Sequence, residues 1–292
     1  MKHAPLMLML ALVAAQAQPG PASGGPGPAT GRLRAGLPPG QNTLYPGNRP
    51  PLRPLPLVKL PVGAVEPAGW LGEQLRRMAR GFSGRLPELS QYCRREGNAW
   101  LDPQGHGRFG WEELPYWLKG YINLGHVLRD RRILEESRQW VEAVLGSQRE
   151  DGWFGPATNL VGEHTLGRLE ALDLWPNMVM IYVLRTHYEA TGDRRVPEFL
   201  LRYYRWFQAQ PLENLLPASW QKYRGGDNLD HIYWLYSQTG ESWLLDAARV
   251  NHERTADWTG GIASWHGVNF GQCFREPAQY FQQTHDPRYL RA

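Results

Sequence analysis

The chain is poor in cysteine, with only Cys93 and Cys273 among 292 residues. It contains neither a Cys-x-x-Cys nor a His-Glu-x-x-His pattern, so the commonest spacings of zinc ligands and redox pairs are missing. In an oxidising compartment the two cysteines would form a disulfide if geometry allowed, and otherwise they are small buried side chains. Spacing alone therefore assigns no metal ligand.

Charge of one sign is also scarce. The formal net charge is +4, and basic residues such as Arg131 and Arg132 are offset by Asp130 and Glu135. Without a basic stripe that carries interleaved aromatics, we expect no nucleic-acid partner. Long apolar runs are missing too, and no segment approaches the ~18 apolar residues of a membrane span. The hydrophobic fraction of 42% nevertheless predicts a folded protein rather than a disordered one.

The N-terminus reads as an export signal followed by a linker. Lys2 precedes the apolar stretch 5–13, and Ala15-Gln16-Ala17 fits the small-x-small cleavage pattern. We predict a signal peptide over residues 1–17 and a secreted or periplasmic protein, since about ten apolar residues are too few to span a bilayer. Residues 18–56 are rich in Pro and Gly and are predicted to be a linker, so the folded domain is expected at 57–292.

Beyond residue 57 apolar side chains recur with the period of an α-helix, and no clear alternating run of a strand competes. The predicted helices are 66–79, 112–128, 133–145, 173–190, 194–209, 227–238, 241–258 and 271–283, and a further helix begins at Pro287. Short turns with capping residues at Asp130, Asp193, Glu241 and Asp286 join them into pairs.

This pattern predicts an all-α fold, an (α/α)6 toroid of which about four of six hairpins are present. An open solenoid is the alternative. We expect the long loops to shape the functional face, and the hairpin count leads us to expect a C-terminally truncated piece with an uncovered apolar face.

Aromatic and polar residues occur together where predicted loops meet helices. Trp111 and Glu112 stand at a helix start, where they would bind a sugar ring or where the acid would only favour the helix terminus. Trp153 follows the tight turn Asp151-Gly152, which favours a structural role over a ligand contact.

Two further junctions carry candidate ligand contacts. Asp227 and Asn228 follow a Gly-rich turn that lacks the lysine and hydroxyl of a phosphate cradle, so they contact a ligand or cap the helix. His266 and Asn269 stand before and within a predicted amphipathic helix. A histidine there would donate to a ligand hydroxyl or serve a structural role.

The motifs, taken in order, resemble the glycoside hydrolase family 127-like domain, also called the domain-of-unknown-function 1680 family, whose best-known members are β-L-arabinofuranosidases. The motifs that carry the resemblance are Leu60-Pro61-Val62-Gly63-Ala64-Val65-Glu66-Pro67-Ala68-Gly69-Trp70-Leu71, Trp111-Glu112, Tyr116-Trp117-Leu118-Lys119-Gly120, Ser147-Gln148, Asp151-Gly152-Trp153-Phe154-Gly155-Pro156, Trp175-Pro176, His187-Tyr188-Glu189-Ala190-Thr191-Gly192-Asp193, Arg224-Gly225-Gly226-Asp227-Asn228 and His266-Gly267-Val268-Asn269. Together they extend over about residues 57–292.

The resemblance implies a retaining glycosidase with a cysteine nucleophile held near Zn²⁺ and a glutamate acid/base. In the family these residues form a Glu-x-Cys and a Cys-Cys pair, and this sequence contains neither. No catalytic residue is therefore assigned, and zinc is implied only for full-length members. His266 matches a substrate-binding histidine of the family, Asp227 matches another polar contact, and Trp175 belongs to a matching motif. The His-Glu-Leu-Tyr stretch of characterised arabinofuranosidases is Leu172-Asp173-Leu174-Trp175 here.

These observations lead us to expect a secreted glycoside hydrolase-like protein that binds carbohydrate and acts on non-reducing-end sugars, such as L-arabinofuranosides of plant-type glycans. We expect this chain to be an inactive fragment. The alternatives are another helical-toroid enzyme, namely a polysaccharide lyase or an unsaturated-uronide hydrolase, and a non-catalytic carbohydrate-binding protein. The oligomeric state does not follow from the sequence.

Overall fold

The computed structural model describes residues 31–33, 44–157, 172–217 and 219–291. The predicted signal peptide and much of the predicted linker lie outside these residues. The described chain is mostly helical, as predicted, with one two-stranded antiparallel sheet. The strands are β1 (Gly31–Leu33) and β2 (Val65–Pro67). The helices are α1 (Gly69–Arg80), α2 (Leu86–Leu89), α3 (Glu113–Leu128), α4 (Arg131–Gly146), α5 (Trp175–Thr191), α6 (Arg195–Ala209), α7 (Ser219–Tyr223), α8 (Gly225–Thr239), α9 (Trp243–Arg254), α10 (Gly267–Cys273) and α11 (Glu276–Thr284).

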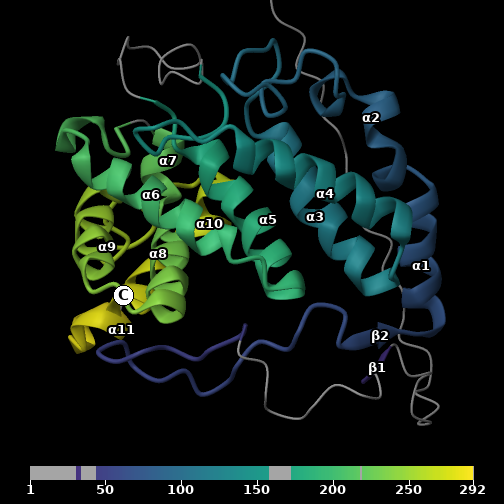
Figure 1. The fold of residues 1–292 in the computed structure, drawn as a ribbon. Coiled ribbons are helices and arrows are strands. Elements are labelled where there is room, and N and C mark those ends of the chain that lie inside the picture. The colour runs from purple at the N-terminus through teal and green to yellow at the C-terminus, as the bar shows by residue number, and fades with distance from the viewer. Residues whose placement is uncertain (1–30, 34–43, 158–171, 218, 292) are drawn as a thin grey trace, which may run out of the picture.

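Three helical hairpins form the body of the molecule, in two layers (Figure 1). The inner helices α3, α5 and α8 contact one another in order, while α4, α6 and α9 pack outside them. The sequence explains the layers. Helix α5 is apolar on nearly all sides and is buried, whereas α4 and α6 each present one apolar stripe to the core. This arc of hairpins is consistent with the predicted toroid.

The short turns within the hairpins follow the prediction in part, because the N-caps of α6 and α9 are Arg194 and Ser242 rather than the predicted Asp193 and Glu241. Gly192 ends α5 and Gly240 ends α8 in the left-handed conformation, which costs glycine little because it has no Cβ. Asp130 caps α4, since its carboxylate accepts a hydrogen bond from the backbone N–H of Ile133. The three hairpins therefore make their sharp turns on one side of the molecule.

The C-terminal region differs from the prediction. The single helix expected at 271–283 is two helices, because Pro277 in the first turn of α11 has no N–H to continue the ladder from α10. The helix expected at 241–258 ends at Arg254, since Thr255 is extended. The helix expected from Pro287 is a short 3₁₀ turn, Pro287–Leu290.

Part of the predicted linker packs against the helices. We call residues 44–53 the N-terminal strap; it contains the buried side chains of Tyr45 and Leu52. In Figure 1 it runs along the lower edge of the molecule, past α11, α8 and α5. It therefore lies on the side of the short hairpin turns.

Hydrogen bonds tie the strap to two helix ends. Gln238, near the end of α8, donates to the carbonyl of Leu44 at 3.0 Å. The backbone N–H of Arg53 donates to the carbonyl of Gln282, near the end of α11, at 2.9 Å. These contacts join part of the predicted linker to the helical body, and the proposed domain boundaries stay a prediction. Among the described residues no helix is long and apolar enough to cross a bilayer.

Candidate functional site

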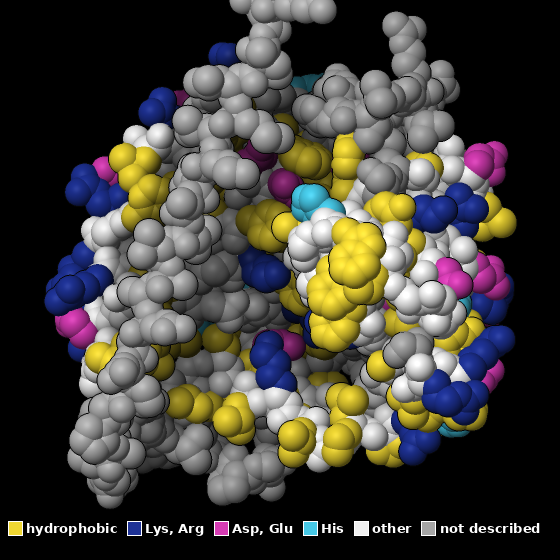
Figure 2. All heavy atoms as spheres, turned by 180° about the vertical axis from the view of Figure 1, so that it is seen from behind, with side chains coloured by type: hydrophobic (Ala, Val, Ile, Leu, Met, Phe, Trp, Pro, Cys, Tyr) yellow, Lys and Arg dark blue, Asp and Glu magenta, His cyan; other side chains and the backbone are white. Residues whose placement is uncertain are grey.

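The N-terminal ends of four helices meet on the side opposite the strap. Glu112 precedes α3, Trp175 begins α5, Arg224 precedes α8, and Asn269 lies in the first turn of α10. Helix N-termini carry partial positive charge, which favours oxygen-rich ligands. Figure 2 shows a hollow in the rear face of the molecule, with acidic, basic and hydrophobic side chains around it.

Glu112 and Arg224 form the centre of this cluster. One carboxylate oxygen of Glu112 accepts from the indole N–H of Trp175 and from Arg224 Nη1, the latter at 3.3 Å. Arg224 Nε donates to Asn269 Oδ1 at 2.8 Å, and its guanidinium lies 4.5 Å from the centre of the Trp175 ring. The Glu112 side chain is 24% exposed and Arg224 is buried. The carboxylate therefore faces solvent while the guanidinium holds it in place.

Asp173 orients the indoles around this pair. Its carboxylate accepts from Trp111 Nε1 at 2.9 Å, from Trp220 Nε1 at 2.8 Å and from the backbone N–H of Trp175 at 3.0 Å. Burial raises the pKa of Asp173, and the three hydrogen bonds act in the opposite direction. A buried carboxylate with this many donors is a structural anchor.

A second carboxylate, Asp227, lies deeper and in a different environment. It is 1% exposed, and one oxygen accepts from the Tyr182 hydroxyl at 3.0 Å and from Arg275 Nη2 at 2.7 Å. Burial raises its pKa to about 6, although Arg275 favours the charged form. Asp227 therefore changes protonation close to neutral pH, which is a property of proton-transfer groups.

Tyr116 and Lys119 connect the two clusters. With Glu112 they lie on one face of α3, at helical spacings of four and three residues. The Tyr116 ring is 6.0 Å from the Trp175 ring, and Lys119 Nζ lies 4.4 Å from the centre of the Tyr182 ring. Seven residues of helix correspond to about 10 Å. The site thus has a mouth at Glu112 and Arg224 and a floor at Lys119 and Asp227.

The structure brings most of the predicted site residues together. Trp111, Glu112, Trp175 and Asn269 belong to the mouth, and Asp227 belongs to the floor. His266 is exposed at the start of α10. Its backbone N–H and the Asn269 amide both donate to Ser264 Oγ, so the His266 loop adjoins the mouth.

Asn228 and Trp153 lie elsewhere. Asn228 is fully buried between α6, α8 and α9, where it accepts from Tyr204 and donates to Asn251. Trp153 is fully buried against Trp206, and its indole N–H donates to the carbonyl of Pro156. The polar groups of both side chains are used in hydrogen bonds within the core, so we do not include Asn228 and Trp153 in the proposed site.

Several site residues were not selected from the sequence. They are Asp173, Arg224, Trp220, Tyr116, Lys119, Tyr182 and Arg275. Arg224 directly precedes the Gly-rich turn, and Asp173 stands two residues before the helix that begins at Trp175. Their positions next to predicted helix starts are the sequence signal that could have identified Arg224 and Asp173 as site residues.

The described residues do not fit the zinc site that the resemblance implies. Cys93 and Cys273 are free and buried rather than paired. Burial raises the pKa of Cys93 to about 11 and raises that of Cys273 as well, so both are protonated thiols and not metal-binding thiolates. No group of three or more His, Cys, Asp or Glu among the described residues is arranged to hold a metal. No step of the chemistry is assigned to zinc.

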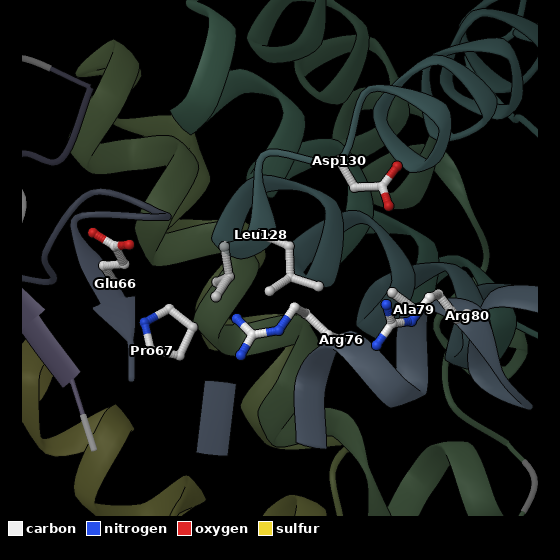
Figure 3. A pocket seen from close by; sticks show the side chains of 8 residues that line it. Glu66, Pro67, Arg76, Ala79, Arg80, Leu128 and Asp130 are labelled. Atoms are coloured by element: carbon white, nitrogen blue, oxygen red, sulfur yellow. The ribbon is translucent and has the colours of Figure 1, made fainter. Parts of the chain in front are cut away.

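A separate pocket lies at the other end of α3. It is bounded by β2, by α1 and by the C-terminal end of α3, and Figure 3 shows Arg76 near Pro67 and Leu128 and Arg80 beside Ala79. These residues belong to the short-turn side of the molecule. The pocket is therefore not part of the site at the helix N-termini.

Comparison with known proteins identifies one family. The family model for the β-L-arabinofuranosidase catalytic domain of glycoside hydrolase family 127 matches residues 84–292. No curated protein and no solved structure matches the chain. The matched region contains every residue of the mouth and the floor, and it extends over more than half of the chain. The chain therefore belongs to the glycoside hydrolase family 127 β-L-arabinofuranosidase-like catalytic-domain family.

Proposed function

We propose that this chain is a secreted glycoside hydrolase-like protein whose site binds non-reducing-end sugars, such as L-arabinofuranosides of plant-type glycans. One observation carries the proposal. The Glu112–Arg224–Asn269 hydrogen-bonded network stands beside the Trp175 ring, where four helix N-termini meet. Secretion is supported by the predicted signal peptide at residues 1–17.

This arrangement suits a sugar for chemical reasons. A carboxylate accepts hydrogen bonds from sugar hydroxyls, and the 24% exposure of Glu112 leaves it accessible. The exposed His266 adds a polar side chain beside the same mouth, and the buried Asn269 holds Arg224 and Ser264 in place. Trp175 is fully buried and orients the network, so the half-buried rings of Trp111 and Tyr116 are the ones that offer apolar faces to sugar C–H groups. The site is therefore matched to a ligand with both hydroxyls and an apolar ring face.

We do not assign a nucleophile. The Glu-x-Cys and Cys-Cys motifs of the family do not occur in this sequence. Both cysteines present are buried, protonated thiols outside the Glu112 network. We therefore expect this chain to bind sugar without hydrolysing a glycoside.

Calorimetric titration with methyl β-L-arabinofuranoside tests the binding. We expect Glu112→Gln to weaken binding about 10- to 100-fold, because hydrogen bonds to charged groups are worth ~1.5–3 kcal/mol. Glu198→Gln is the matched control, since Glu198 is exposed in the first turn of the outer helix α6. Equal affinity of the wild type and Glu112→Gln for the sugar would contradict the proposal that the sugar binds at Glu112. Turnover of an aryl β-L-arabinofuranoside by this chain would contradict the expected inactivity.

A further inference from the structure

Lys119 is a cation in the interior of the site without a carboxylate hydrogen-bonded to it among the described residues. Its ammonium lies over the Tyr182 ring at 4.4 Å and 6.0 Å from the Tyr116 ring. By contrast, Lys59 holds Glu189 at 2.6 Å. Burial lowers the pKa of Lys119, and Asp227 opposes that shift. A half-buried ammonium over two aromatic rings is prepared for an anionic partner.

Arg275 approaches the same ring from its hydroxyl end. One of its nitrogens, Nη2, donates to the Tyr182 hydroxyl at 3.0 Å and to Asp227 at 2.7 Å. The side chain is 42% exposed, so the guanidinium keeps further N–H groups for a ligand. Lys119 and Arg275 therefore contact the same side chain, Tyr182, and both belong to the floor of the site.

The charges of the floor do not cancel. Asp227 is the carboxylate that neutralises Arg275, while the neighbouring Arg185 and Asp230 pair with each other at 2.6 Å. His231 is uncharged, since burial holds its pKa far below the ordinary value. At the mouth Glu112 pairs with Arg224. Lys119 thus remains as the positive charge in excess on the floor.

We propose that this floor binds the carboxylate of an acidic sugar, so that the ligand of the hollow is a glycan unit with a uronic acid group. The proposal rests on the proposed function, because it assumes that the hollow binds carbohydrate. The sugar carboxylate accepts from the Lys119 ammonium and the free N–H groups of Arg275. The ring of the sugar lies against Tyr116 and Tyr182. Both cations point to the same substrate class, and neither is needed to bind a neutral sugar.

A matched pair of glycosides tests this inference by calorimetry on the whole chain. Methyl α-D-galacturonoside and methyl α-D-galactoside differ only in the oxidation of one carbon. We expect the acid to bind about 10- to 100-fold more tightly. Added salt should reduce the preference, because part of it is charge attraction. Acetate alone, at the same concentration, should not bind measurably, since it lacks the sugar ring.

Variants then locate the effect. Lys119→Met keeps the aliphatic stem and removes the charge, so the preference for the acid should fall sharply and leave only the contribution of Arg275. Lys222→Met removes an exposed lysine on α7 and should leave the preference intact. Far-ultraviolet circular dichroism checks that each variant folds. The ratio of the wild-type affinities for the acidic and the neutral glycoside tests the proposal even if a variant fails to fold.

The outcomes are distinct. Equal affinity of the wild type for both glycosides would overturn the acidic-sugar site and leave the proposed function standing. Acetate binding as tightly as the uronide would overturn it as well, in favour of a simple anion site. Failure to bind either glycoside or the arabinofuranoside would overturn both proposals.

Discussion

At the scale of residues, two buried carboxylates of the site show how environment decides a role. Asp173 is surrounded by three N–H donors, which stabilise its charge while it orients two indoles. Asp227 has fewer donors, and burial raises its pKa to about 6. Burial raises the pKa of both carboxyl groups, but the three donors around Asp173 also give it an orienting role that Asp227 lacks. Residue type alone does not distinguish them.

Asp227 should make the stability of the folded protein depend on pH. Below pH 3.8 it is protonated in both states and contributes no cost. As pH rises from 3.8 to about 6 the unfolded state loses this proton before the folded state does, so the free energy of unfolding falls. Between pH 3.5 and pH 7, the free energy of unfolding of the wild type should fall by about 3 kcal/mol more than that of Asp227→Asn. Urea unfolding of both proteins between pH 3.5 and 7.5 measures it.

The pH slope is the test, because Asp227→Asn also removes the charge partner of Arg275 at every pH. Asp257→Asn serves as control. Asp257 is exposed and its pKa is lowered by hydrogen bonds from Thr259, so this variant should follow the wild-type decline between pH 4 and 6. Parallel curves for wild type and Asp227→Asn would show that Asp227 is not the group responsible.

The sequence identified the mouth better than the interactions that hold it together. Trp111, Glu112 and Asn269 were recognisable because each stands next to a predicted helix start with a turn signal. Asp173 was missed because its partner Trp111 is 62 residues away in the chain. A pairing of that kind depends on how hairpins stack. Lys119 entered the sequence analysis only as a member of a family motif, since the helical pattern does not tell a helix face that points into the site from one that points to solvent.

At the scale of elements, helical periodicity located the hairpins well because each buries one apolar stripe. It missed the break between α10 and α11, where a single proline changes the hydrogen-bonding pattern without changing the apolar spacing. It also missed the strap. A Pro-rich segment has no period to detect, and Leu52 is buried by helices that lie almost two hundred residues later or more.

The strap should contribute to stability in proportion to what it buries. Leu52 is 2% exposed, whereas Leu57, five residues later, is 82% exposed. We expect Leu52→Ala to lower the free energy of unfolding by about 3 kcal/mol, since it removes buried methyl groups and leaves a cavity. Leu57→Ala should change it by less than about 0.5 kcal/mol. Chemical unfolding measures both, and similar effects of the two variants would mean that the strap does not pack in solution.

At the scale of the whole molecule, several large apolar side chains on and just before α10 are exposed on the described surface. They are Ile262, Trp265, Val268, Phe270 and Phe274, and we call them the α10 patch. The rings of Phe270 and Phe274 stack on each other. Figure 2 shows hydrophobic side chains gathered on the same rear face as the hollow. Exposed apolar side chains gathered on one face favour self-association in water.

Replacing one ring of this patch should therefore improve solution behaviour. We expect Phe274→Ser, at 56% exposure, to reduce the fraction of aggregated protein in sedimentation velocity without lowering the unfolding midpoint. Leu290 has the same exposure but lies outside the α10 patch, so Leu290→Ser is the matched control and should have little effect. An equal improvement from both variants would attribute the aggregation to general hydrophobicity rather than to this face.

The strap also has a consequence for biosynthesis. Its residues are made early, yet they bind groups such as Gln238 and His285, which follow in the chain by 194 and 234 residues. Contacts of such long range are entropically costly to close and tend to form late. On a translating ribosome the strap must stay undocked until α8 and α11 have been made. Its docking would then report that these two helices have folded, and protection of the segment against proteases would mark a late stage of maturation.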